Sequence, residues 1–182
     1  MIVVLTKIYT KISQCDYDKI IKSVSYDSLK CIHCKDTGMH YHGLYKRGVK
    51  NADDPEKKTT ITVTRVRCNN KECGRTHALL LGGMVPYSQI ELMDTVEILT
   101  AESSDELNEI MDENPHINPI DIYLMRKKYK MYWEQYVGKK KLGAITLYDL
   151  VISCAEKYNK HFMQIYKTLC SIHIIQADPP SI

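Results

Sequence analysis

The chain carries CIHC at residues 31–34 and CNNKEC at residues 68–73, two cysteine motifs that lie 33 residues apart. Each motif places two thiols on one tight turn, where both can reach a single Zn²⁺ ion at about 2.3 Å. Between the motifs, the alternating run TITVTRVR (60–67) predicts a half-buried strand, and residues 40–46 predict its partner, with a hairpin tip at 51–56. A hairpin would bring the two motifs together, so this segment predicts a zinc ribbon.

The predicted metal ligands are Cys31, Cys34, Cys68 and Cys73. Four thiolates complete a tetrahedral shell and leave no position for water, so we expect the Zn²⁺ ion to be structural. Two alternatives remain open. In the first, His33 or His77 replaces a cysteine, because the second spacer is longer than the common two residues. In the second, CIHC is a redox pair and the other cysteines are unrelated.

Charge is distributed unevenly along the chain. The net charge is +3, but residues 76–118 carry nine acidic and no basic side chains. Residues 35–75 carry ten basic and five acidic side chains, and residues 119–141 carry seven and two. Such segregation favours anionic partners at defined faces of the protein.

The N-terminal sequence gives no sign of export. The apolar run at residues 1–5 is too short for a signal peptide, and no stretch reaches the roughly 20 apolar residues that a membrane span needs. The seven cysteines are an odd number, which argues against a disulfide framework. We therefore expect a cytoplasmic protein without a membrane partner.

Residues from Pro86 onward have helical periodicity. The expected helices are 87–99, one that begins after Ser103 or Ser104 and includes Met111, 118–136, and one that runs from Thr146 toward Pro179. Near the N-terminus we expect a strand within 2–9 and a helix at 16–24. The chain is therefore predicted to be α+β with two domains. Residues 1–85 form a β-rich zinc ribbon with an N-terminal extension, and 86–182 form a helical domain.

Three helices between residues 87 and 136 have the lengths and the short turn of a helix-turn-helix, with 118–136 as the recognition helix. Side chains near its N-terminus would face bases, and its later lysines, with those at 139–141, would contact phosphates. The predicted DNA-binding residues are Asn118, Tyr123, Arg126, Lys127, Lys128 and Lys130 on this helix, and Lys46, Arg47, Arg65 and Arg67 on the ribbon. The alternative is a solvated basic face that packs against the acidic second helix.

Several of these motifs together resemble a known family. They are LKCIHC (29–34), HGLYKR (42–47), RVRC (65–68), CGRTHALL (73–80), VPYS (85–88) and FMQI (162–165). The string resembles an uncharacterised family of bacterial proteins that pair an N-terminal zinc ribbon with a helix-turn-helix. That family is similar to the N-terminal DNA-binding region of insertion-sequence transposases. The resemblance implies a DNA-binding protein of a mobile genetic element, although the four-residue second cysteine spacer departs from the two expected of most relatives.

The sequence lacks the motifs of a catalytic domain. Only 41 residues follow Lys141, too few for the ribonuclease-H-like core of a transposase, and no phosphate-binding Gly-rich loop is present. We predict a non-catalytic protein that binds double-stranded DNA, takes no small-molecule substrate and acts as a regulator or accessory factor. The last helix either caps the bundle or pairs with a second copy in a homodimer.

Two other classes of function remain open. The first is a protein-interaction module or inhibitor whose acidic helices at 87–113 mimic nucleic acid. The second is an enzyme with an open zinc position, which would need a histidine beside the metal. The candidate histidines are His33, His40, His42 and His77.

Overall fold

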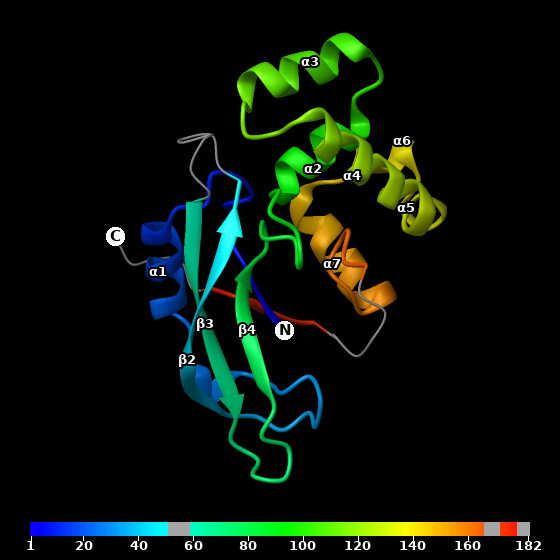
Figure 1. Ribbon diagram of the computed structural model, residues 1–182. Helices are drawn as coiled ribbons and strands as arrows, with labels where there is room; N and C mark the ends of the chain where they lie inside the picture. The colour runs from blue at the N-terminus through cyan, green and yellow to red at the C-terminus, as the bar shows by residue number, and fades with distance from the viewer. Residues whose placement is uncertain (51–58, 166–171, 178–182) are drawn as a thin grey trace.

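Strands dominate the first half of the chain and helices the second, which confirms the α+β prediction (Figure 1). The computed structural model describes residues 1–50, 59–165 and 172–177. Its strands are β1 (Ile2–Leu5), β2 (Met39–Val49), β3 (Thr59–Cys68), β4 (Thr76–Leu81) and β5 (His173–Gln176). They form one sheet in the order β2-β3-β4-β1-β5, in which β1 runs parallel to β4 and β5, and β3 runs antiparallel to β2 and β4.

Strand β1 separates two hydrophobic cores. Its four residues are all buried, which explains why its sequence is apolar without alternation. Because successive side chains point to opposite faces, Ile2 and Val4 pack into the core of the sheet and its cysteine loops. Val3 and Leu5 pack into the core of the helices. The strand thereby connects the two halves of the molecule.

The hairpin of β2 and β3 forms at the predicted place. Its register pairs Met39 with Cys68 and Val49 with Thr59, and a bulge lies between Tyr41 and Gly43. Strand β4 adds to β3 and was not predicted. The hairpin tip expected at 51–56 lies outside the described residues.

Helix α1 (Gln14–Lys22) covers β3 and confirms the helix predicted at 16–24. The Ser13 side chain caps its N-terminus by accepting from the backbone N–H of Asp16. Tyr17 is fully buried, and its hydroxyl donates to the carbonyl of Leu79 at 2.9 Å and accepts from the amide of Thr64 at 2.8 Å. A short 3₁₀ helix, η1 (Tyr26–Ser28), leads into the first cysteine motif.

The helices of the second half lie to one side of the sheet, with α3 farthest from it (Figure 1). They are α2 (Leu92–Thr100), α3 (Ser104–Glu113), α4 (Pro119–Tyr132), α5 (Glu134–Val137), α6 (Lys139–Leu142) and α7 (Leu147–Tyr158). The prediction that the first of them begins at 87 is wrong. Tyr87 has φ 61°, and the Ser88 side chain bonds to the Ile90 backbone, so residues 87–91 form a turn.

The prediction of one long C-terminal helix is also wrong. Helix α7 ends at Tyr158, because Asn159 adopts the left-handed conformation that ends many helices. The chain then turns so that Phe162 is buried in the helical core, and β5 pairs with β1. The final described strand thus belongs to the N-terminal sheet and crosses the expected division at residue 86.

The surface of α7 that was considered for a homodimer is used within the chain. Leu150, Val151 and Cys154 form its buried face, and they pack into the helical core. Residues 166–171, over which the last helix was predicted to continue, lie outside the described residues. None of the described helices combines the length and the apolar character needed to cross a membrane.

Candidate metal centre and candidate nucleic-acid interface

The four predicted ligands come together at one end of the sheet. The Sγ atoms of Cys31, Cys34, Cys68 and Cys73 all lie within 4.8 Å of one another. The Sγ atoms of Cys31 and Cys73 are 3.7 Å apart, and those of Cys34 and Cys68 are 3.5 Å apart. Four sulfurs at about 2.3 Å from a tetrahedral ion would be about 3.8 Å apart, so the cluster has the size of a metal–thiolate site.

Two tight loops hold the sulfurs, and we call residues 31–38 and 68–76 the cysteine loops. In the first loop, the amide of Cys31 donates to the carbonyl of Asp36 at 2.8 Å. In the second, the Asn70 side chain accepts from the amides of Glu72 and Cys73. Such side-chain turns fix the backbone locally, so the spacing of the cysteines determines where their sulfurs point.

The two cysteine loops are also joined to each other. The Asn70 side chain donates to the Asp36 carboxylate, and the amide of Asn69 donates to the carbonyl of Gly38 at 3.2 Å. His40 on β2 contacts the Asn69 side chain at 2.7 Å. These contacts fix the position of each cysteine pair relative to the other.

The thiols of the cluster differ in how readily they ionise. Burial opposes ionisation of Cys31, but the backbone N–H groups of Cys34 and His33, together with the thiols of Cys34 and Cys73, outweigh it and lower its pKa. At Cys34, the Asp36 amide favours the thiolate. Burial and the neighbouring thiols outweigh that contact and raise the pKa of Cys34 to about 12. Four thiolates this close repel one another, so a bound cation would stabilise the ionised cluster.

His77 is the histidine that lies against the cluster. Its Nε2 atom is 3.3 Å from the Sγ atom of Cys31, and its ring is 5% exposed. Burial lowers the pKa of His77 to about 4, so the imidazole is neutral at pH 7. A neutral ring with its proton on Nε2 would donate to the Cys31 thiolate. Within the described residues, the group that could hold a metal consists of the four cysteines alone.

Three other histidines were candidates. His33 is exposed in the first cysteine loop, where its backbone N–H contacts the Cys31 sulfur. His40 and His42 are both exposed on β2, and His42 lies in the bulge between Tyr41 and Gly43. The redox-pair alternative required the CIHC cysteines to be apart from the other two. The structure instead places Cys34 beside Cys68 and Cys31 beside Cys73.

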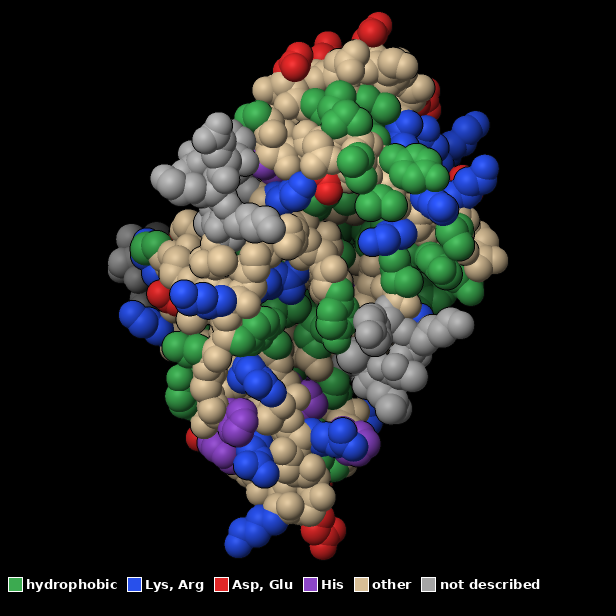
Figure 2. Space-filling model, viewed as in Figure 1, with side chains coloured by type: hydrophobic (Ala, Val, Ile, Leu, Met, Phe, Trp, Pro, Cys, Tyr) green, Lys and Arg blue, Asp and Glu red, His purple; other side chains and the backbone are tan. Residues whose placement is uncertain are grey.

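The helical half carries a basic surface. We call the exposed side chains of Lys127, Lys128, Lys130, Lys139, Lys140 and Lys141 the basic face. None of them forms an ion pair with a described carboxylate, and Glu134 is the one acidic residue between 122 and 142. Figure 2 shows Lys and Arg side chains beside hydrophobic ones over this part of the molecule. The exposed apolar neighbours include Tyr123, which is 60% exposed and lies under the Lys127 ammonium at 5.6 Å.

Two of the predicted arginines stabilise the fold instead of facing outward. The Arg126 guanidinium donates to the carbonyls of Ile98 at 3.1 Å and Ala101 at 2.6 Å, so it caps the C-terminus of α2. The Arg47 guanidinium donates to the carbonyls of Val85 at 2.5 Å and Ser88 at 2.8 Å. Both charges are satisfied by main-chain oxygens, which removes them from the surface available to a partner.

The remaining predicted residues also divide into those that stabilise the fold and those that stay exposed. Asn118 is the N-cap of α4 and forms a capping box with Asp121. Arg65 donates to the Thr76 hydroxyl at 2.7 Å. Lys46 and Arg67 are exposed on the ribbon, although Arg67 also donates to the Gly74 carbonyl at 3.0 Å.

The acidic block does not neutralise the basic face. Helix α3 exposes Asp105, Glu106, Glu109, Asp112 and Glu113. No described residue of α3 forms an ion pair with α4, so the alternative of mutual pairing gains no support. On α2, by contrast, Glu91 and Asp94 are buried. Burial and the nearby charge of Asp94 raise the pKa of Glu91 to about 7, although the Ile12 amide donates to its carboxylate at 3.0 Å.

Sequence reasoning missed an aromatic cavity beside α4. Trp133, Tyr136 and Tyr158 line it, and none of them was among the predicted site residues. A signal was present, because Tyr132 and Tyr136 share a helical face with Lys128. The pattern gave no means of telling an open cavity from a filled core.

Comparison with known proteins supplies one match. Residues 28–115 match a family model described as a domain of unknown function (DUF6431). The match includes both cysteine loops, α2 and α3, and it ends before α4. No curated protein and no solved structure matches the chain.

Proposed function

We propose that the protein is a non-catalytic, zinc-stabilised protein that binds double-stranded DNA through its basic face. The cluster of four thiols supports the metal, because its size and donor set fit Zn²⁺. With four protein ligands the ion would have no open position, so its contribution would be to hold the cysteine loops together.

The observation that carries DNA binding is the basic face, whose lysines have no described ionic partner. Five of its six exposed lysines make no described hydrogen bond to the main chain, whereas Lys139 donates to the Ala101 carbonyl at 3.3 Å, and phosphates are the anions that such basic clusters bind by counterion release. Tyr123 at the N-terminal part of α4 adds a side chain that can contact bases. On the ribbon, Lys46 and Arg67 are the exposed members of the predicted set.

The acidic block is compatible with this role because of where it lies. Helix α3, whose five carboxylates are exposed, lies at the end of the molecule farthest from the sheet, as Figure 1 shows, and the two acids at the start of α2 are buried. A duplex on α4 would therefore not meet Glu91 or Asp94. The resemblance of the sequence to a transposase-like DNA-binding region supports a regulator or accessory factor of a mobile element.

A salt series tests the proposal. Binding of fluorescently labelled duplex DNA is measured by anisotropy from low to moderate salt for the wild type and for Lys127→Ala/Lys128→Ala. Loss of two phosphate contacts should weaken binding and reduce the slope of log K against log salt by about 2.

The matched control is Lys19→Ala/Lys22→Ala, which removes the same charge from exposed positions on α1. It should retain the wild-type slope. Equal losses in both double variants would show that net charge matters and the basic face does not. No binding at low salt would overturn the proposal.

One observation favours a second candidate. Helix α3 presents five exposed carboxylates on a short amphipathic helix, which is the arrangement a protein partner with a basic groove would recognise. In that case the acidic helices would mimic nucleic acid, and the protein would compete with DNA for its partner.

A further inference from the structure

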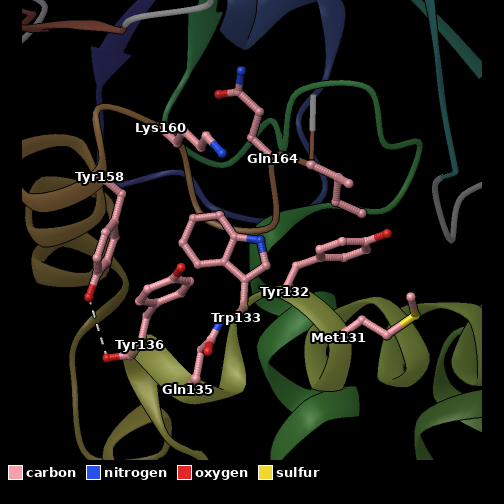
Figure 3. A pocket seen from close by; sticks show the side chains of 9 residues that line it. Met131, Tyr132, Trp133, Gln135, Tyr136, Tyr158, Lys160 and Gln164 are labelled. Atoms are coloured by element: carbon pink, nitrogen blue, oxygen red, sulfur yellow. Dashed lines mark hydrogen bonds between the residues drawn. The ribbon is translucent and has the colours of Figure 1, made fainter. Parts of the chain in front are cut away.

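The aromatic cavity is formed where α4 passes into α5 and meets the end of α7. Its volume is about 640 Å³, and the described residues that carry the argument are Tyr132, Trp133, Tyr136, Tyr158 and Lys160. Figure 3 shows the four rings around the cavity, with Lys160 above the indole. The space is large enough for a flat heterocycle together with solvent.

One wall of the cavity is held rigid by ring packing. The Trp133 indole meets Phe162 edge-to-face at 5.4 Å between centroids, and it meets Tyr158 at 6.0 Å and 89°. Trp133 is 3% exposed, so its position is fixed by the helical core. The ring centroids of Tyr136 and Tyr158 are 4.9 Å apart. Tyr136 is 54% exposed, which places its ring at the open side of the cavity. A preorganised aromatic wall is the feature that stacking ligands require.

The charge of the lining selects among flat ligands. Lys160 is the one charged residue among the described residues of the lining, and no described carboxylate is present. Binding of a cationic ligand is disfavoured here, because the ammonium group of Lys160 already lies in the lining. A planar group that carries a neighbouring anion is favoured, because the rings stack on the plane and Lys160 attracts the charge.

The cavity lies at the C-terminal end of α4, the helix that carries three lysines of the basic face. A second cavity of about 530 Å³ shares the lining residue Ile165 with it. Lys128 and Leu124 line this second cavity together with Asp121, which is ion-paired with Lys50, and Lys128 precedes Tyr132 by one helical turn. The aromatic cavity itself has Lys160 in its lining.

We propose that the aromatic cavity receives one unpaired nucleobase of the bound DNA, with Lys128 and Lys160 at the flanking phosphates. This inference rests on the proposed function, and it names the form of DNA that the protein prefers: a duplex with one base outside the helix. Stacking on aromatic side chains tolerates any base, since every base has a π face. Extrusion is least costly where the base is already unpaired, so the preference should be for bulged DNA.

The single tryptophan makes the proposal testable in the intact protein. Trp133 is the one tryptophan of the chain, so its fluorescence reports on the cavity. Two labelled duplexes are compared, one fully paired and one with a single bulged adenine. Anisotropy measures binding anywhere on the protein, and quenching of Trp133 measures occupation of the cavity.

The expected result is stronger quenching and tighter binding with the bulged duplex. Tyr136→Ala should reduce the ratio of bulged to paired affinity by about tenfold, and Tyr136→Phe should keep that ratio because the ring remains. The control is Tyr148→Ala, which removes an exposed ring of α7 outside the cavity and should leave the ratio unchanged.

Two results separate the failure of this inference from the failure of the proposed function. Equal binding of both duplexes without quenching of Trp133 would overturn the inference and leave DNA binding by the basic face intact. Absence of any anisotropy change at low salt would overturn the proposed function and, with it, the inference.

Discussion

The cysteine loops and helix α4 are the two regions that the sequence marks for function, and they use their marked residues differently. In the cysteine loops, all four predicted ligands meet within 4.8 Å. On α4, Asn118 and Arg126 turn out to hold the fold, while the neighbouring lysines stay exposed. A tight turn restricts where a side chain can go, whereas a helix side chain points wherever tertiary packing places the helix. Local spacing is therefore the more reliable guide to chemistry.

The largest expected effect tests whether metal holds the cysteine loops. Cys68→Ser should abolish metal binding and cause the greatest loss of stability, because structural Zn²⁺ contributes on the order of 10 kcal/mol in zinc-finger peptides at pH 7. Thermal unfolding followed by circular dichroism, with metal content measured on the same samples, checks this. Cys15→Ser is the control, since Cys15 is exposed and outside the cluster. If Cys68→Ser melted as the wild type does, the loops would be held by hydrogen bonds alone.

The next largest effect is a difference in stability between variants of two adjacent residues of α4, Arg126 and Lys127. Arg126→Ala should lower the free energy of unfolding by about 2–4 kcal/mol, because two carbonyls of α2 lose a charged donor. Lys127→Ala should change stability by less than about 0.5 kcal/mol, since it is exposed. Urea unfolding of both variants measures the difference. Equal stability of the two would contradict the capping role of Arg126 and return it to the DNA-binding set.

Much of the fold could be predicted because its signals are local. The alternation at 60–67 predicted β3, and Ser103, Asn118 and Thr146 predicted the starts of helices α3, α4 and α7 by their capping side chains. Strand β5 could not be predicted, since its four residues become a strand only by pairing with β1, more than 160 residues away. The end of α7 depends on Asn159 entering the left-handed region, which its apolar continuation concealed.

In the candidate site, as in the fold, the features that depend on local spacing could be predicted and those that depend on distant contacts could not. The metal ligands followed from spacing, and His77 was already an alternative ligand that now lies against Cys31. The aromatic cavity was not predictable, because it requires Tyr158 of α7 to meet Trp133, a contact that no local pattern encodes. The internal use of Arg47 was hidden for the same reason, since its acceptors are carbonyls of residues 85 and 88.

The buried carboxyl of Glu91, at the start of α2, has a large effect that the sequence did not mark. Burial raises the pKa of Glu91 to about 7, whereas in the unfolded chain it ionises near its ordinary value of 4.5. The folded state thus holds a proton that the unfolded state has lost, so this group destabilises the fold as pH rises from about 4.5 to 7. Glu91→Gln keeps an acceptor for the Ile12 amide, and it should be more stable than the wild type by about 1–3 kcal/mol at pH 8.

Urea unfolding between pH 5 and 7 measures this effect of Glu91. The stability of the wild type should fall with pH more steeply than that of Glu91→Gln. Glu109→Gln on the exposed surface of α3 should keep the wild-type slope. Parallel slopes for the wild type and Glu91→Gln would show that Glu91 is ionised in the folded protein at pH 6.

The smallest effect decides which role Asn118 has. As the N-cap of α4, its side chain accepts from the amide of Asp121 at 2.9 Å, so Asn118→Ala should cost about 1 kcal/mol of stability. Asn118→Ser should be as stable as the wild type, because serine caps equally well, but serine lacks the amide that pairs with adenine. If Asn118 only caps the helix, Asn118→Ser will match the wild type in both urea unfolding and duplex binding. Wild-type stability with weakened duplex binding would place Asn118 on the bases after all, and the contrast between the cysteine loops and α4 would then be confined to Arg126.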